Sequence, residues 1–280
     1  PAVAGNRKTF TWSGWIKNSL QTYGSVFAAG NNNFVLKLAG ASGNTYSAQV
    51  YDYTGSGFNL ELTSTAVFRD PAAWYHLVCA VDTTQATASN RVKLYINGVQ
   101  ITSFSSSTYP TQNLDTYANS TVAHYHNVFG SSYLSTTYAG DQYLAEINFI
   151  DGQALTPSSF GKTNAATGQW IPKKYGGTYG TNGFYLKFAD ASAATAAAIG
   201  KDSSGNGNNW TPNNISVTSG ATYDSMTDVP TLTSATAANY AVLNPLWKGA
   251  NTTISNGNLY ATNSTNARSE EHTSELQSRL

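Results

Sequence analysis

The stretch Trp74-Tyr-His-Leu-Val-Cys-Ala-Val-Asp82, followed after a polar loop by Arg91-Val-Lys-Leu-Tyr-Ile-Asn-Gly-Val-Gln-Ile101, decides the fold of this chain. From Val92 to Ile96 apolar residues occupy every second position, which is the period of a β-strand with one buried face. Asn97-Gly98 then separates two such runs, and a type I′ turn needs positive φ at both of its central positions. The sequence therefore predicts a strand, a loop, a second strand, a tight turn and a returning strand.

Similar alternating runs occur elsewhere, separated by clusters of Gly, Asn and Ser. The segments Thr9–Lys17, Phe34–Leu38 and Tyr46–Val50 alternate apolar with other side chains. A further run, Gly140–Phe160, alternates in the same way up to an Asp151-Gly152 turn. Many short strands with such punctuation, and no amphipathic helical stripe, predict an all-β antiparallel sandwich.

Three motifs resemble the laminin-G, or concanavalin A-like, jelly-roll family: a Trp-x-His strand at Trp74, a Leu-Tyr-x-Asn-Gly hairpin at Leu94–Gly98, and an Ala-Leu-Thr turn at Ala154–Thr156. The resemblance covers about residues 7–160 and keeps the family order. It implies an antiparallel concanavalin A-like jelly-roll β-sandwich with a binding function, and it names no ligand. Family members usually carry one or two strands before the Phe-Thr-x-Ser-Gly-Trp strand, so we expect N-terminal strands to be missing here.

We predict four segments along the chain. Residues 1–165 form the jelly roll, and residues 166–230 hold a linker, an appended strand at Gly183–Ala189 and an Asp-Ser-Ser-Gly-Asn-Gly-Asn loop. That strand either begins a second module or wraps back to complete the sandwich, which we favour because a lone strand leaves unpaired edges. Residues 231–267, in an irregular C-terminal tail, resemble the truncated start of a SPRY-like module. Residues 268–280 resemble a translated sequencing adapter and are excluded from the fold prediction.

Charge is scarce along this chain. Only 11% of residues are charged, against about 25% in an ordinary soluble domain, and the formal net charge is zero. The sequence shows no basic footprint for nucleic acid, no apolar run long enough for a membrane helix, and no signal peptide. Cys79 is the single cysteine, which excludes an intrachain disulfide, and its apolar register predicts burial. Neutral sugars or another protein are therefore the expected partners.

The acidic residues disfavour hydrolytic chemistry. A retaining glycosidase needs two carboxylates about 5–5.5 Å apart. Outside the last segment the only glutamates are Glu61 and Glu146, and neither has an acidic residue two positions later. Asp141 and Glu146 are five positions apart and fall on opposite faces of a strand. No Gly-x-Ser-x-Gly elbow occurs, and His76 is expected at the surface or in a hydrogen bond. We predict no catalytic residue and no enzyme.

Ligand spacing raises two metal hypotheses. His124 and His126 share one strand face at a spacing that suits a transition-metal pair, with a plain polar face as the alternative. Asp202, Asn206 and Asn208 offer the oxygen ligands that calcium prefers, along a Gly-containing loop. Jelly-roll lectins and laminin-G domains often hold Ca²⁺ at a rim, so the resemblance supports a calcium cofactor. A glycine/asparagine turn without an ion explains this loop equally well.

Aromatic residues are the candidate ligand contacts, because the chain has 18 tyrosines and 6 tryptophans. Tyrosine offers a large stiff ring and a hydroxyl at recognition surfaces. Such rings stack on the apolar faces of sugars, whereas the alternative is that they cover the edges of the sandwich. The predicted ligand-binding residues, which fall in or beside loops, are Tyr51, Tyr53, Tyr117, Tyr125, Tyr133 and Tyr138.

The run from Trp12-Ser-Gly-Trp15 to Asn214 resembles virion-associated proteins of marine bacteriophages. The resemblance implies a non-catalytic carbohydrate-binding domain of a virion or tail-fibre protein, outside the cell, which adheres to cell-surface glycan through rim loops. The rival interpretation is a structural spacer or decoration module that binds neighbouring virion protein, in a homo-oligomer such as a trimer. A glycoside hydrolase of the same superfamily ranks third.

Overall fold

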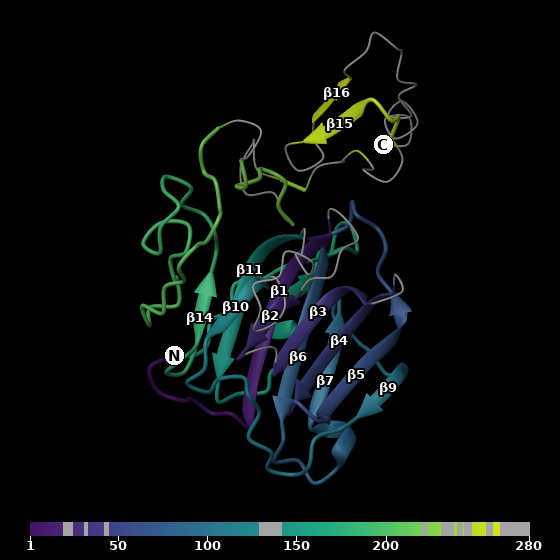
Figure 1. The fold of residues 1–280 in the computed structure, drawn as a ribbon, viewed down its shortest axis with the longest axis vertical. Coiled ribbons are helices and arrows are strands. Elements are labelled where there is room, and N and C mark those ends of the chain that lie inside the picture. Colours follow the sequence, from purple (N-terminus) through teal and green to yellow (C-terminus); the bar gives the residue numbers. More distant parts are fainter. Residues whose placement is uncertain are drawn as a thin grey trace.

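The computed structural model describes residues 1–18, 25–30, 33–41, 45–128, 142–219, 223–230, 238–239, 243, 248–255 and 260–263. Side chains at 39–41, 45 and 125–128 lie outside this description. Two antiparallel six-stranded sheets face each other (Figure 1). The predicted all-β jelly-roll sandwich is therefore confirmed. In the described part of the chain, no helix combines the length and apolar character needed to cross a bilayer.

The first sheet contains the strands that the deciding stretch predicts. Its order is β14 (Phe184–Leu186), β11 (Gln142–Asp151), β1 (Thr9–Asn18), β6 (Tyr75–Asp82), β7 (Val92–Ile96) and β8 (Val99–Gln100). Asn97 (φ 49°) and Gly98 (φ 85°) connect β7 to β8, and both have the positive φ that the predicted turn requires.

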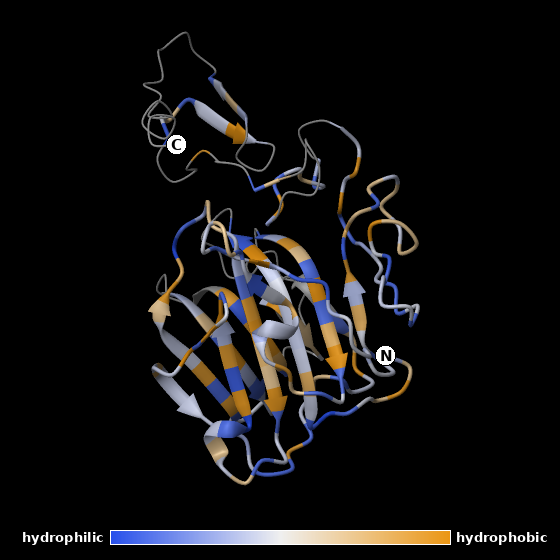
Figure 2. Ribbon diagram, turned by 180° about the vertical axis from the view of Figure 1, so that it is seen from behind, coloured by the Kyte–Doolittle hydropathy of each residue, from blue (hydrophilic) through white to orange (hydrophobic). Residues whose placement is uncertain are grey.

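The second sheet has the order β10 (His124–Val128), β2 (Ser25–Ala29), β3 (Phe34–Ala41), β4 (Thr45–Tyr53), β5 (Phe58–Val67) and β9 (Phe104–Thr108). Hydropathy alternates along these strands (Figure 2), because successive side chains point to opposite faces. Two smaller sheets pair β12 (Gly161–Thr163) with β13 (Trp170–Pro172), and β15 (Thr252–Ser255) with β16 (Tyr260–Asn263). Single 3-10 turns occur at Ala88–Asn90 and Pro157–Ser159.

The core fills the space between the two large sheets. Phe10 of the first sheet packs edge-on against Phe34 of the second, with ring centroids 5.7 Å apart. Trp12 and Leu36 are also completely buried, and each such side chain contributes about 1.5–3 kcal/mol through its removal from water. Cys79 lies in the same core, where burial raises the pKa of its thiol to about 12, so it is an inert apolar side chain as the sequence predicted.

The outer face of the first sheet is covered by the chain that follows β11. Three aromatic residues of this segment are buried in one cluster with Tyr95 and other side chains of the sheet: Phe160, Tyr175 and Tyr179. The chain then returns as β14, which pairs antiparallel with residues 147–149 of β11 and forms the edge of the sheet. The predicted domain boundaries remain a prediction, although this strand is part of the first sheet.

Candidate functional site

Two of the predicted tyrosines, Tyr51 and Tyr53, lie together on the outer face of the second sheet, at the end of β4. They share this face because they are two positions apart in the strand, and Asp52 between them is completely buried. Phe58 begins β5 and packs against both rings, with centroid distances of 5.7 Å to Tyr51 and 5.0 Å to Tyr53. Phe58 is 46% exposed. These three residues form an aromatic surface that we call the hairpin patch.

Polar side chains flank the hairpin patch on the same face. Glu61 pairs across the strands with Tyr51 and accepts a 2.8 Å hydrogen bond from the Ser106 hydroxyl. The Lys37 ammonium lies 5.2 Å from the centroid of the Tyr51 ring, which is a cation–π distance. Burial lowers the pKa of Lys37 and raises the pKa of Tyr51 to about 12, so the Tyr51 hydroxyl stays protonated at neutral pH. Apolar rings and hydrogen-bonding groups thus occur side by side.

Of the other four predicted tyrosines, Tyr117 is the one whose side chain is described. Tyr117 packs against the core, and its backbone N–H donates a 2.8 Å hydrogen bond to Oδ2 of the buried Asp52. Tyr125 pairs with Ala28 through its backbone in β10, but its side chain lies outside the described residues. Tyr133 and Tyr138 also lie outside them. Phe58 and Glu61 were missed by sequence reasoning, although their position across a hairpin from Tyr51 follows from strand pairing.

The predicted calcium ligand Asp202 uses its carboxylate for hydrogen bonds within the protein. Oδ1 accepts from the backbone N–H groups of Tyr185 and Ser204, each at 2.8 Å. Oδ2 accepts from the Ser204 hydroxyl at 2.8 Å and from the Asn208 N–H at 2.9 Å. A cation at this carboxylate would compete with four donors.

The other two predicted calcium ligands hold the same loop against the chain before β14. The side-chain Nδ2 groups of Asn206 and Asn208 both donate to the carbonyl of Gly183, at 2.8 and 2.9 Å. The structure therefore brings the three predicted residues together, and protein hydrogen bonds connect all three of them within the loop. Within the described ranges, no three His, Cys, Asp or Glu side chains gather closely enough to hold a metal ion.

His76 lies on the outer face of the first sheet. It is hydrogen-bonded, which is one of the two predicted outcomes, but it does not lie at the surface of the protein. It is completely buried, stacked on Trp15 with ring centroids 5.0 Å apart, and covered by Trp170 of β13. The Trp170 Nε1–H donates to Nδ1 of His76 at 2.9 Å, and an indole N–H can only donate. The neutral ring therefore carries its proton on Nε2, which lies 2.9 Å from the Ser13 hydroxyl oxygen.

This tautomer rules out a serine–histidine dyad at that position. Nε2–H donates to Ser13, so His76 has no lone pair with which to take the hydroxyl proton. Burial lowers the pKa of His76 to about 3, which keeps the ring neutral at physiological pH. His76 is therefore a structural group that joins Trp170 to the sheet.

His124 is similarly engaged on both ring nitrogens. Nε2 accepts a 3.0 Å hydrogen bond from the Asn119 N–H, and Nδ1 donates to the Val122 carbonyl at 2.8 Å. Burial, which is the largest cause, lowers the pKa of His124 to about 4. The lone pair of Nε2 is used by the Asn119 N–H and Nδ1 carries the proton, so neither nitrogen has a free lone pair for a metal. The side chain of His126 lies outside the described residues.

Glu61 and Glu146 are too far apart in the fold to act as a pair. Glu61 lies on the outer face of the second sheet, whereas Glu146 of β11 bonds to the Tyr185 hydroxyl over the outer face of the first. Burial raises the pKa of Glu146, although the Tyr185 hydrogen bond opposes this. The sandwich core separates the two carboxylates, so they cannot flank one glycosidic bond.

Comparison with known proteins agrees with this fold. Residues 1–139 match the family model of the "Concanavalin A-like lectin/glucanases superfamily". The jelly roll of this chain belongs to that superfamily, as its motifs predicted, and the family name covers both lectins and glucanases. No curated protein matches the chain.

Several solved structures share part of the architecture. Domain 4 of AbnA, an extracellular arabinanase from Geobacillus stearothermophilus in complex with arabinotriose, has 20% identity over 56% of this chain and 65% of that chain, with a TM-score of 0.36. A putative carbohydrate binding protein from Bacteroides ovatus has 15% identity over 71% and 50%, with a TM-score of 0.46. Tailspike protein 2 of Escherichia coli O157:H7 bacteriophage CAB120 has 13% identity over 56% and 21%, with a TM-score of 0.40. At these values the similarity transfers no ligand and no activity.

Proposed function

We propose that this chain is a non-catalytic carbohydrate-binding domain that engages cell-surface glycan through the hairpin patch. The observation that carries the proposal is the exposed Phe58 ring, which packs against Tyr51 and Tyr53, together with Glu61, which pairs with Tyr51 across the strands. Aromatic faces match the C–H faces of a sugar ring, and adjacent polar groups match its hydroxyls. Membership of a superfamily that includes lectins supports the same ligand class.

The absence of a second acid near Glu61 supports binding without bond cleavage. Among the described strand positions on the outer face of the second sheet, Glu61 is the one carboxylic acid. Hydrolysis with either stereochemical outcome needs an acid and a second carboxylate. We therefore propose that the domain binds and releases glycan without cleaving it.

We further propose that the domain belongs to a phage virion protein, such as a tail fibre, and works outside the cell. The support is the resemblance of its motifs to virion-associated proteins of marine bacteriophages. The second candidate is a structural module that binds neighbouring virion protein. Exposed apolar residues away from the hairpin patch, such as Val67 and Val99, favour that candidate if they lie at a subunit contact.

A glycan array with the full chain and three variants tests the proposal. Tyr53→Ala and Phe58→Ala should each weaken glycan binding about tenfold or more, as expected for an aromatic contact worth about 1.4 kcal/mol or more. Tyr260→Ala is the matched control, because Tyr260 is 56% exposed and lies in a different sheet. No bound glycan, or equal losses in all three variants, would refute the proposed site. Release of reducing sugar from a bound glycan would refute the non-catalytic assignment.

A further inference from the structure

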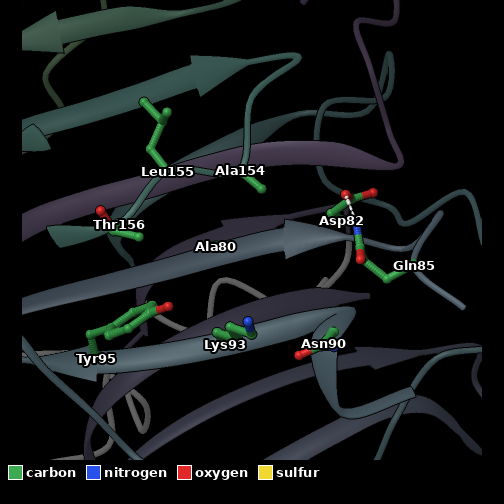
Figure 3. Close-up of a pocket in the computed structure, with 9 residues that line it drawn as sticks. All are labelled: Ala80, Asp82, Gln85, Asn90, Lys93, Tyr95, Ala154, Leu155 and Thr156. Atoms are coloured by element: carbon green, nitrogen blue, oxygen red, sulfur yellow. Dashed lines mark hydrogen bonds between the residues drawn. The ribbon is translucent and has the colours of Figure 1, made fainter. Parts of the chain in front are cut away.

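A separate pocket lies on the opposite side of the sandwich, on the outer face of the first sheet (Figure 3). It forms where β6 and β7 meet the loop that follows β11, and its volume is about 260 Å³. Pockets for drug-sized ligands span roughly 300–1,000 Å³. This pocket is slightly smaller, so it has room for one small ring and not for an extended chain.

Hydrogen bonds hold the loop wall of this pocket in place. The Thr11 hydroxyl donates to the Gln153 carbonyl at 2.7 Å and accepts from the Leu155 N–H at 2.8 Å. This loop is therefore attached to β1, at the centre of the sheet. A wall fixed in this way loses little conformational entropy when a ligand binds.

The facing wall is fixed as well. The Arg91 guanidinium donates to the carbonyls of Gln85 and Ala86, each at 2.8 Å. The carboxylate of Asp82 accepts hydrogen bonds from Thr84 on Oδ1 and from the Gln85 side chain on Oδ2. Asp82 thus serves as the anchor of this wall, and most of its hydrogen-bonding capacity is used inside the protein.

Three polar groups in the pocket remain available to a ligand. The Lys93 ammonium, the Asn90 amide and the Tyr95 hydroxyl have no hydrogen-bond partner in the part of the chain that the structure describes. Figure 3 shows Lys93 between Tyr95 and Asn90, with Leu155 across from them. The pocket therefore combines apolar walls with donors and acceptors that bond to no described protein group.

We propose that this pocket binds a single neutral sugar ring, such as the terminal residue of a glycan. Leu155 and the Tyr95 ring would contact the C–H face of the sugar, while Lys93 and Asn90 bind its hydroxyls. The lining carries one positive and one negative side chain, Lys93 and Asp82, so it does not favour a charged ligand. This inference rests on the proposed function, because it assigns the same ligand class to a second place. Two sites on opposite faces would let one domain contact two glycan chains at once.

Ligand-observed NMR with the methyl glycosides of glucose, galactose and mannose tests the pocket in the full chain. Lys93→Met removes the free donors, and Leu155→Trp fills the cavity. Lys162→Met is the control, because Lys162 is an exposed lysine on β12. Each pocket variant should weaken binding of the responding glycoside about tenfold or more, and the control should bind like the natural chain. Urea unfolding of every variant identifies any variant that does not fold. If one pocket variant does not fold, the binding result of the other pocket variant tests the inference.

The outcomes separate this inference from the proposed function. If neither pocket variant weakens binding, or if no glycoside binds, the pocket is not a sugar site. If Phe58→Ala abolishes glycoside binding while Lys93→Met does not, the hairpin patch holds the sugar and the pocket inference fails alone. If Lys93→Met abolishes glycoside binding and Phe58→Ala leaves array binding intact, the pocket stands and the hairpin patch fails.

Discussion

Lys17 of β1 and Asp228, 211 residues later in the chain, form an ion pair in which the two side chains are only 1% and 2% exposed. Lys17 points to the outer face of the first sheet, because its neighbour Ile16 points into the core. The pair therefore fastens the segment around Asp228 to the central strand of that sheet. Removing one partner of a buried ion pair leaves an uncompensated charge, which is far more costly than losing an exposed pair.

We expect Asp228→Ala to destabilise the protein by about 3–5 kcal/mol, or to release the segment around residue 228 so that water reaches Lys17. Urea unfolding measures the first result, and limited proteolysis of that segment measures the second. The double variant Lys17→Met/Asp228→Leu should recover most of the loss, because it removes both charges and keeps apolar volume. Strictly additive losses in the double variant would show that the pair is not coupled.

A second prediction concerns the proton on His76. With Trp170 donating to Nδ1, the ring should be the neutral Nε2–H tautomer, which ¹⁵N–¹H correlation spectra identify directly. Trp170→Phe removes the donor and leaves a buried acceptor without a partner, at a cost of about 1–3 kcal/mol in addition to lost packing. Trp74→Phe is the matched control, because the buried Trp74 Nε1 has no hydrogen-bond partner among the described residues. An Nδ1–H tautomer in the natural chain would contradict the assignment.

The stability of the fold should fall as the solution is acidified. Folding lowers the pKa of His76 to about 3 and that of His124 to about 4, below their ordinary value of 6.5. Between these values the unfolded chain binds more protons than the folded one, so stability decreases with falling pH, by up to about 1.4 kcal/mol per pH unit for each histidine. The raised pKa values of Asp52 and Glu146 act in the opposite sense and offset part of the loss at the acidic end.

Urea unfolding between pH 7 and pH 4.5 measures this dependence. His76→Phe should reduce the dependence of the free energy of unfolding on pH by up to about 1.4 kcal/mol per pH unit, because this variant removes one of the two buried histidine rings. A natural chain whose stability does not change over this range would show that these histidines are not buried as described.

The loop around Asp202 gives a fourth prediction. Asp202→Ala leaves donors of Tyr185, Ser204 and Asn208 without their acceptor and should cost at least about 2 kcal/mol. Asp190→Ala, at an exposed position, is the control and should cost much less. Since calcium must displace these donors, we expect a dissociation constant no tighter than the roughly 10⁻⁴–10⁻³ M of weak extracellular sites. Micromolar binding in isothermal titration calorimetry would establish a calcium site that rearranges the loop.

Sequence reasoning was strongest where structure depends on neighbouring residues. Strict alternation in Val92–Ile96 and the Asn97-Gly98 turn led to the correct hairpin, because strand period and turn conformation are local properties. The same reasoning predicted a strand over Tyr46–Val50 but placed Tyr51 and Tyr53 in or beside loops, whereas both residues lie in β4. It missed Phe58, which joins them only after β4 and β5 pair.

Local sequence patterns could not predict which residues on the outer faces of the sheets are buried. Alternation indicates which face of a strand a side chain takes, but it does not indicate what covers that face. His76 is buried because Trp170, 94 residues away, closes over it. The pocket at Lys93 was also missed, since its walls come from three segments that meet only in the folded chain.

The order of residues by itself determined the two-layer β architecture, since a period of two, tight glycine turns and a lack of helical stripes leave few other ways to bury the apolar faces. Tertiary structure alone decided which polar groups are enclosed and which face solvent. Contacts such as Lys17 with Asp228 and Trp170 with His76 join residues far apart in the chain, and their formation depends on long-range packing that no local pattern encodes.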